Sequence, residues 1–276
     1  MIVIIDIEYM KRRFLNTHKY NLNLDNPKSF NEKIQWIKIN GNLERFTKYT
    51  DKYEVRNYVK EKLGEAYLVP LIGIFEDVSE IPYKELPNAF VMKATHGSGW
   101  NIVITDKGKV DWKNECLKMK KWLATNFYVT NSQKNYNSIK PRIIIEEYLE
   151  DPSGDLKDYK FFCFEGKPHF IQINGEKSKQ QQRNLYNTEW VKLDVKYKFD
   201  NFAKQINKPK SLNKMLNIAS VLSKPFGFVR VDLYNLDNII KFGELTFTPI
   251  NGYGKFTPTE FDFELGSLLN LKKYLD

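Results

Sequence analysis

The sequence GFVRVDLYNLDNIIKFGELTF, residues 227–247, carries the strongest signal of how this chain folds. Its two apolar runs alternate with period two, which is typical of two neighbouring β-strands. The alternation puts Arg230 and Asp232 on one face of the first strand, and Glu244 and Thr246 on one face of the second. Oxygen ligands on adjacent strands suit a Mg²⁺ ion that also binds substrate phosphates. A salt bridge from Arg230 to Asp232 or Glu244 explains the pattern equally well.

A second informative stretch is VMKATHGSGWNIV, residues 91–103. A phosphate-binding P-loop places its lysine after the glycines and then continues into a helix. Here Lys93 precedes the glycines and the β-branched run WNIVI follows them, so the pattern predicts a β-hairpin with a glycine-rich tip. The backbone N–H groups of such a tip can cover phosphates, and Lys93 at its base can reach a phosphate oxygen.

The composition is that of a folded globular protein. The chain has 276 residues, enough for one large domain or two modest ones, and 42% of them are hydrophobic. No apolar run is long enough for a membrane span, and the opening MIVII is too short for a signal peptide. Cys116 and Cys163 form neither a metal-binding nor a disulfide pattern. We therefore expect a cytoplasmic protein.

The formal net charge of +9 raises the question of nucleic-acid binding. The lysines are scattered along the chain beside Asn and Glu, as on an ordinary solvated surface, and no nucleic-acid-binding motif accompanies them. We expect no nucleic-acid partner. The excess positive charge would instead help to attract an anionic small molecule or an acidic polymer.

Helical patterns dominate the first part of the chain. In NPKSFNEKIQWIKIN, residues 26–40, Ser29 is a candidate N-cap with Glu32 three residues later. The next pattern, TDKYEVRNYVKEKLG, predicts a helix that is capped by Thr50 or Asp51 and stops at the closing glycine. A strand-like run, YLVPLIGIF, follows it and leads to the predicted hairpin, so this part forms an α+β unit.

The middle of the chain predicts a helix and a strand with an acidic end. Residues 111–126 are amphipathic, with Trp112, Leu117 and Trp122 expected on the core face. The strand pattern RIIIEEYLED ends in two acids and resembles a hinge, whose backbone and carboxylates could contact an adenine or a ribose.

The last part of the chain predicts a second α+β unit. DYKFFCFEGKPHFIQI reads as a hairpin that turns at Glu165 and Gly166, and a helix is expected near residues 211–223. Between them lies the polar segment NGEKSKQQQRNLYN, which we expect to be a loop that folds over the acceptor substrate through Lys177, Lys179 and Arg183. An ordinary exposed loop is the equally weighted alternative.

The order of these motifs resembles the ATP-grasp superfamily. The quoted matches are TDKYEV, VMKATHGSGWN, IIIEEYLED and VRVDLY followed by FGELTF, and the last pair is especially similar to D-alanine:D-alanine ligases. Within the superfamily, NLNLDNPKSFNEKIQWIKI, DKYEVR, KATHGSG, DYKFFCFEGKP and GELTFTP look like the TupA-like branch, which is associated with teichuronopeptide and other surface-polysaccharide synthesis.

The resemblance implies an α+β ATP-grasp fold in which two subdomains grip ATP. We expect a short, mainly helical N-terminal segment over residues 1–50, a first subdomain with the glycine-rich flap over residues 51–145, and a second subdomain with the metal-binding strands over residues 146–276.

The resemblance also implies site residues. Arg230 would stabilise charge on a carboxylate during its activation. Thr246 stands where the superfamily usually has Asn, so the resemblance does not decide which group is the third metal ligand. His96 is a catalytic candidate because it lies in the flap, and a structural role is the alternative. The ATP contacts would be Lys52, Lys93, Gly97, Ser98, Gly99, Glu146, Glu147, Tyr148, Leu149, Asp158 and Lys160, and the Mg²⁺ ligands Asp232, Glu244 and Thr246.

The activity that this resemblance implies is an ATP- and Mg²⁺-dependent ligase. It would join the carboxylate of a uronic or amino acid, or of a glycan, to an amine through an acyl phosphate. One alternative is an ATP-grasp kinase that phosphorylates a sugar hydroxyl. Another is a non-catalytic basic binding protein, which predicts salt-dependent binding without nucleotide turnover.

Overall fold

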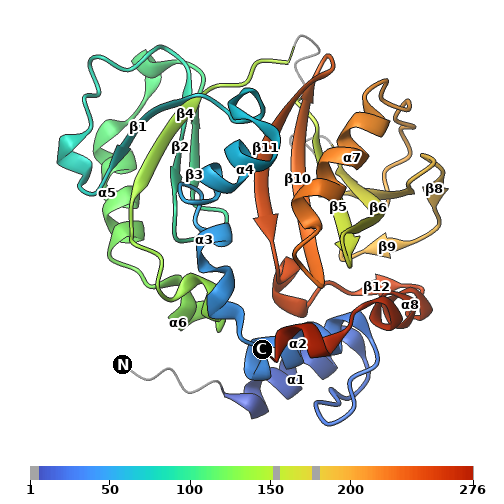
Figure 1. The fold of residues 1–276 in the computed structure, drawn as a ribbon. Coiled ribbons are helices and arrows are strands. Elements are labelled where there is room, and N and C mark those ends of the chain that lie inside the picture. Colours follow the sequence, from blue (N-terminus) through green and yellow to red (C-terminus); the bar gives the residue numbers. More distant parts are fainter. Residues whose placement is uncertain (1–5, 152–155, 176–180, 276) are drawn as a thin grey trace. The chain divides into compact units, whose positions relative to one another are not determined.

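The computed structural model describes residues 6–151, 156–175 and 181–275 (Figure 1). The chain divides into two compact units, and we describe each by itself. Unit 1 consists of Met1–Leu43 and Lys157–Asp276, and unit 2 of Glu44–Leu156. Within the described residues, none of the helices combines the length and the apolar character that crossing a bilayer requires.

Unit 2 is built on a four-stranded antiparallel sheet (Figure 1). Helix α5 packs on strand β2, and both contribute to a core that includes Phe90, Met92 and Met119. The predicted hairpin is confirmed, because β2 pairs with β3 from Phe90 opposite Ile104 to Lys93 opposite Asn101. The strands, in sheet order, are β1 (Leu71–Phe75), β4 (Ile143–Glu147), β2 (Phe90–Ala94) and β3 (Asn101–Ile104). The helices are α3 (Thr47–Thr50), α4 (Val55–Leu63), α5 (Trp112–Leu123) and α6 (Phe127–Asn131).

One predicted core residue of α5 is wrong. Trp112 and Trp122 pack against the core, but the side chain of Leu117 is 60% exposed. Met119 is fully buried, and at 100° per residue Leu117 lies about 160° around the helix from it. Leu117 therefore points to the opposite side of the helix.

Unit 1 is built on a six-stranded antiparallel sheet, and helix α7 (Leu212–Ser223) contacts three of its strands: β10, β5 and β6. A two-stranded sheet, in which β12 (Phe256–Thr257) pairs with β9 (Lys196–Tyr197), completes the unit. The predicted helix near 211–223 and the last strand pair are confirmed. The strands, in sheet order, are β11 (Ile239–Thr246), β10 (Phe228–Leu236), β5 (Asp158–Phe164), β6 (Lys167–Asn174), β7 (Arg183–Asn187) and β8 (Lys192–Leu193).

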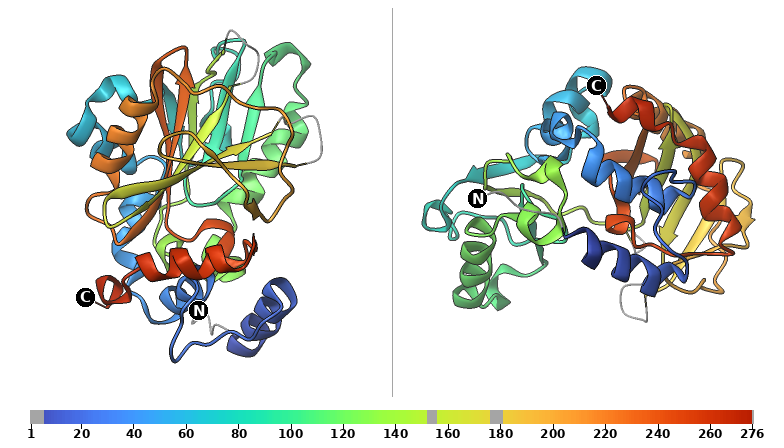
Figure 2. Two further views of the ribbon diagram at one scale, coloured as in Figure 1. Left: turned by 90° about the vertical axis from the view of Figure 1, so that its right-hand side faces the viewer. Right: turned by 90° about the horizontal axis from the view of Figure 1, so that it is seen from below.

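The N-terminal helices belong to unit 1. Helices α1 (Ile7–His18), α2 (Phe30–Asn40) and α8 (Glu260–Leu268) lie together at one end of this unit (Figure 2). The predicted capping box of α2 is confirmed: the Ser29 hydroxyl accepts from the Glu32 N–H at 3.1 Å, and the Glu32 carboxylate accepts from the Ser29 N–H at 2.9 Å. The predicted division into three segments remains a prediction about domains.

Two predicted details of the β5–β7 region have different outcomes. The turn at Glu165 and Gly166 is confirmed, with φ of 47° and 76°, so both residues are left-handed as in a two-residue hairpin turn. The predicted loop is wrong at its end, because Arg183 begins strand β7 and pairs with Asn174 of β6. The reason is that Leu185 and its neighbours are buried in the sheet, which a surface loop would leave exposed.

Candidate functional site

One face of the six-stranded sheet carries a line of charged and polar side chains. Glu244, Asp232 and Lys160 are successive cross-strand partners on β11, β10 and β5. Because side chains two residues apart share a face, Arg230, Thr246 and Asp158 lie on this face as well. We call these six residues the charged row: Asp158, Lys160, Arg230, Asp232, Glu244 and Thr246.

Asp232 is the centre of the charged row. Its carboxylate accepts from Arg230 Nε at 2.7 Å, from Arg230 NH2 at 2.7 Å and from Lys160 Nζ at 2.6 Å. The residue is only 2% exposed, so the two cations supply the counter-charge that a buried carboxylate needs. Lys160 also donates to Asp158, and the second oxygen of Asp158, Oδ1, is buried without a partner in the described structure.

Glu244 is the most exposed carboxylate of the charged row, ahead of Asp158, whose side chain is 29% exposed. Arg230 NH2 donates to Glu244 Oε1 at 2.9 Å, and the Thr246 hydroxyl donates to the same oxygen at 3.0 Å. The Glu244 side chain is 34% exposed, against 3% for Asp232. Arg230 therefore joins a buried carboxylate to one that a ligand can reach.

The charges of the row keep its cations protonated. Burial lowers the pKa of Lys160, but the charges of Asp158 and Asp232 outweigh it, so that the pKa lies above its ordinary value. The pKa of Arg230 is likewise raised, because Asp232 and Glu244 outweigh the effect of burial. Both side chains are fixed positive charges at neutral pH.

The charged row contains the three residues predicted to bind Mg²⁺. Among the residues that the structure describes, no group of three or more His, Cys, Asp or Glu could hold a metal ion. Asp232, Glu244 and Thr246 instead offer two carboxylates and a hydroxyl, and Mg²⁺ is commonly bound by one or two carboxylates together with substrate phosphates. The donor chemistry fits Mg²⁺. The salt bridge that was the alternative expectation, from Arg230 to Asp232 and Glu244, is also present.

Unit 2 has its own buried carboxylate, Glu146 on β4. Lys93 Nζ lies 2.7 Å from one of its oxygens and Arg56 NH1 lies 2.9 Å from the other. Arg56 NH2 also donates to the Val69 carbonyl at 2.9 Å. We call Arg56, Lys93 and Glu146 the Glu146 cluster. Arg56 was not among the predicted site residues, because its contact depends on how helix α4 packs beside the sheet.

The flap of unit 2 is partly packed and partly exposed. Lys52 Nζ donates to the Gly97 carbonyl, which ties the predicted phosphate-binding lysine to the flap. A Cβ on Gly97 would lie 2.2 Å from the Trp100 ring, so this position needs glycine for packing. Ser98 and Gly99 are exposed at the tip, and Gly99 has a left-handed φ of 74°.

His96 lies beneath the flap rather than at its surface. The residue is 3% exposed, and its Nε2 donates to the Trp122 carbonyl at 2.9 Å. Its ring contacts Trp100 with centroids 5.3 Å apart, and burial lowers its pKa. The catalytic role stays a prediction, and it would require the buried imidazole to become accessible.

The remaining predicted residues are spread over both units. Glu147 ends β4 with an exposed side chain, Tyr148 is 37% exposed and Leu149 is half-buried. Their neighbour Glu146 contacts another predicted residue, Lys93. Lys177 and Lys179 lie outside the described residues.

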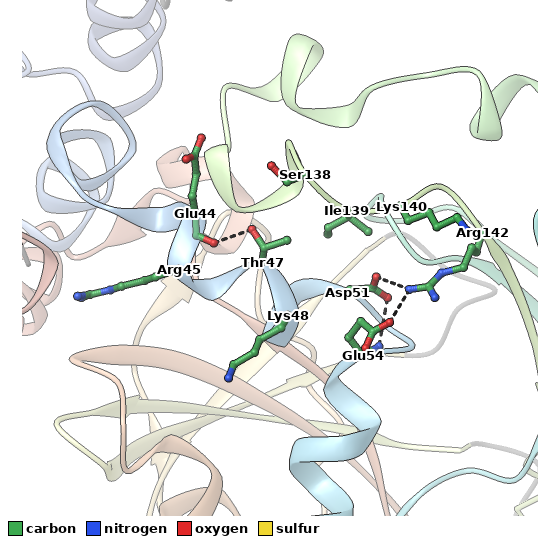
Figure 3. Close-up of a pocket in the computed structure, with 10 residues that line it drawn as sticks. All are labelled: Glu44, Arg45, Thr47, Lys48, Asp51, Glu54, Ser138, Ile139, Lys140 and Arg142. Atoms are coloured by element: carbon green, nitrogen blue, oxygen red, sulfur yellow. Dashed lines mark hydrogen bonds and ion pairs between the residues drawn. The ribbon is translucent and has the colours of Figure 1, made fainter.

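A cavity of about 440 Å³ opens in unit 2 beside the start of α4 (Figure 3). On its wall, Arg142 binds Asp51 at 2.8 Å and Glu54 at 2.9 Å. Asp51 also accepts from the Tyr53 N–H at 2.8 Å, in the turn before α4. The predicted capping of this helix by Thr50 or Asp51 is wrong, because α4 begins at Val55 and its N-cap residue is Glu54, which makes no side-chain cap. These paired charges fix the turn that carries Lys52. The lining residues are Glu44, Arg45, Thr47, Lys48, Asp51, Glu54, Ser138, Ile139, Lys140 and Arg142.

Comparison with known proteins gives one family and several similar structures. A family model described as TupA-like ATPgrasp matches residues 32–270. No curated protein is significantly similar in sequence. A D-alanine--D-alanine ligase from Bacillus anthracis complexed with ATP is 16% identical, covers 75% of this chain and has a TM-score of 0.43; the chain spans 57% of its length. A second structure of the Bacillus anthracis ligase is 15% identical, with 84% and 67% of the two chains covered and a TM-score of 0.47. The ligase from Helicobacter pylori is 13% identical, with 88% and 67% covered and a TM-score of 0.44.

Proposed function

The chain belongs to the TupA-like ATP-grasp family, and on this premise we propose that it is an ATP-dependent ligase that joins a carboxylate to an amine. The observation that carries the proposal is the position of Arg230, which binds the buried Asp232 and the accessible Glu244 at the same time. A fixed guanidinium beside reachable oxygen ligands suits chemistry in which negative charge develops on phosphate and carboxylate oxygens.

The reaction solves the problem that a carboxylate is a poor electrophile. A carboxylate oxygen takes the γ-phosphoryl group of ATP, the bond from phosphorus to the ADP oxygen breaks, and an acyl phosphate forms. The amine nitrogen then attacks the acyl carbon, inorganic phosphate leaves, and the nitrogen loses a proton to give the amide. Arg230 would stabilise the charge on the oxygens of both steps.

We assign the ATP phosphates to Lys52 and Lys93, with Gly97, Ser98 and Gly99 covering them. The support is that Glu146 binds the Lys93 ammonium at 2.7 Å and so fixes its position, and that the exposed tip has the backbone freedom of glycine. Glu146, Glu147, Tyr148, Leu149, Asp158 and Lys160 keep their proposed roles around the nucleotide.

Asp232 and Glu244, with Thr246 beside them, would hold Mg²⁺, which when bound neutralises phosphate charge. Glu244 is the better exposed of the two carboxylates, and the Thr246 hydroxyl orients it through the 3.0 Å hydrogen bond. Lys160 would keep the buried end of Asp232 neutralised throughout.

The acid substrate would be a uronic or amino acid, and the amide product would belong to surface-polysaccharide synthesis. This assignment rests on the resemblance of the sequence motifs to the TupA-like branch, and the net charge of +9 would favour the approach of an acid.

The proposal is tested by ADP release from the purified protein. Uronic and amino acids are screened in pairs with amines in the presence of ATP and Mg²⁺, and products are identified by mass spectrometry. We expect ADP release that needs both an acid and an amine, an amide product, and loss of turnover in Glu244→Gln.

The matched control is Glu264→Gln, which makes the same change at an exposed position of α8 and should behave like the parent. Turnover by Glu244→Gln equal to the parent would contradict the metal assignment. ADP release that needs no amine and leaves a stable phosphorylated sugar would identify a kinase instead.

A further inference from the structure

The face that carries the charged row continues onto β6 and β7. Lys160 pairs with Gln172 of β6, Gln172 pairs with Leu185 of β7, and Arg183 lies two residues before Leu185. Residues two apart on a strand share a face, so Gln172 and Arg183 lie on the same face as Lys160. Gln172 has no role in the reaction described above, and Arg183 was predicted from the sequence only as part of a loop over the acceptor substrate.

Gln172 presents a polar atom that nothing in the described structure satisfies. The residue is 1% exposed, and its Nε2 donates to Asn174 Oδ1 at 2.8 Å. Its Oε1 is buried and has no hydrogen-bond partner among the described residues. A buried acceptor without a donor costs free energy, which a hydroxyl group of a ligand would recover.

Arg183 is a cation that has no carboxylate partner among the described residues. No carboxylate of the described chain lies within ion-pair distance of it, and its NH1 is buried without a partner. Its guanidinium lies over the rings of Phe199, at 4.6 Å from the centroid, and Tyr197, at 5.6 Å. Arg56, Arg142 and Arg230, whose side chains are 11–14% exposed, each bind a carboxylate.

A second cation lies beside Arg183. Lys198 Nζ is 5.0 Å from the centroid of the Phe199 ring, the same ring that Arg183 covers. Burial and the charge of Arg183 both lower the pKa of Lys198, and burial together with the charge of Arg230 lowers that of Arg183. Arg183 and the exposed Lys198 thus share one aromatic ring, and an anion beside that ring would relieve the repulsion between them.

We propose that Arg183, Lys198 and Gln172 form an anion subsite for an acidic sugar. The anionic group binds Arg183 and Lys198, a hydroxyl group donates to Gln172 Oε1, and the Tyr197 and Phe199 rings flank the cations. A sugar carboxylate and a sugar phosphate share this chemistry, and the test separates them. That the bound sugar is the acceptor of the ligase rests on the proposed function.

The test is direct binding, measured by titration calorimetry with three probes. D-glucuronate and D-glucose 6-phosphate are the anionic probes, and D-glucose is the neutral hydroxylated control. We expect one or both anions to bind and D-glucose to bind at least about tenfold more weakly, as expected for the loss of a charge-assisted contact. Which anion binds tighter identifies a carboxylate or a phosphate as the natural group.

The variants separate binding from a structural role. Arg183→Gln should weaken binding of the anionic probe by about tenfold or more, Arg183→Lys should retain part of it, and Gln172→Met should weaken it several-fold. Lys208→Gln removes the same charge from an exposed position and should bind within about twofold of the parent. Melting temperatures of the variants close to that of the parent, with Arg183→Lys as the conservative case, exclude misfolding as the cause.

Three results would overturn the subsite: binding of neither anion, equal binding by Arg183→Gln and the parent, or displacement of the sugar by a non-hydrolysable ATP analogue. The last result would assign these residues to the nucleotide. The proposed ligase activity fails separately, because it is measured by ADP release and the Glu244→Gln variant. An intact ligase without the subsite, or a subsite without turnover, is thus recognised.

Discussion

Each unit neutralises a buried carboxylate, but the neutralising cations come from different parts of the fold. Asp232 in unit 1 and Glu146 in unit 2 are each buried carboxylates bound by one arginine and one lysine. The partners of Asp232 come from its own and the neighbouring strand, at 2.6 and 2.7 Å. One partner of Glu146 comes instead from helix α4. Strand register alone fixes the first arrangement, whereas the second also depends on helix packing.

Removing Asp232 should destabilise the protein more than removing Glu146, because the side chains around Asp232 are the more deeply buried. Asp232 leaves about 3% of its side chain exposed and Arg230 about 11%, while Lys93 leaves 16% and Arg56 14%. Removing a carboxylate from a buried ion pair strands the cations, and the cost rises as water is excluded. The predictions below follow from that ranking.

The largest effect is expected for Asp232→Asn. The change leaves Arg230 and Lys160 buried with less counter-charge, and we expect a loss of about 3–5 kcal/mol in the free energy of unfolding. Urea denaturation measures it. Asp194→Asn, at an exposed position of the same unit, is the control and should change stability by less than about 0.5 kcal/mol.

Glu146→Gln should cost less, about 2–3 kcal/mol, because Lys93 and Arg56 are partly solvated and Arg56 keeps its bond to the Val69 carbonyl. The same denaturation experiment applies, with the exposed Glu147→Gln as its control. A loss as large as that of Asp232→Asn would contradict the prediction, since the depth of burial would then not determine how much stability each carboxylate contributes.

Each unit also buries a histidine, and the one in unit 1, His18, should make the stability of the protein depend on pH. Burial lowers the pKa of His18 to about 4, so the folded state holds it neutral and loses stability as the pH falls from about 6.5. At pH 5 this loss is about 2 kcal/mol relative to neutral pH. Burial raises the pKa of Asp262 to about 6, which stabilises the folded state as the pH falls through 6 and opposes His18.

His18→Gln should therefore reverse the direction in which the free energy of unfolding changes between pH 7 and pH 5. With the histidine removed, the Asp262 contribution remains, and the variant should lose about 2 kcal/mol less than the parent between pH 7 and pH 5. Unfolding free energies at the two pH values measure this difference. Parallel pH profiles of parent and variant would show that His18 is not held neutral by the fold.

The smallest effect is expected at the flap tip. Ser98 and Gly99 are exposed while Lys93 lies in the strand ladder, so ATP and Mg²⁺ should slow hydrogen exchange at residues 98–100 several-fold and leave Lys93 nearly unchanged. Residues 228–234 of β10 are the internal reference. Equal exchange at the tip with and without nucleotide would contradict the assigned closure.

What the sequence could predict follows from how local each feature is. The period-two pattern placed Arg230, Asp232, Glu244 and Thr246 on one face, because a strand's own geometry determines it. The Ser29 capping box and the turn at Gly166 are equally local. The contact of Arg56 with Glu146 could not be predicted, because 90 residues separate them and the helix must first dock.

The errors have the same origin. Leu117 is apolar but lies on the outer side of α5, since its place depends on which stripe of the helix meets the sheet. Arg183 follows a polar run, yet its neighbours complete a sheet edge that only the pairing with β6 defines. His96 lies in the predicted flap, but its burial depends on Trp100 and Trp122.

Lys93 forms its ion pair with one carboxylate, Glu146, whereas Lys160 lies between two, Asp158 and Asp232. If Lys93 turns to another anion, Glu146 keeps Arg56 and is never left as a lone buried charge. Moving Lys93 to another anion therefore leaves no unpaired carboxylate behind it in the Glu146 cluster. Arg56 would then influence how readily Lys93 leaves Glu146 for another anion, although Arg56 itself contacts no substrate.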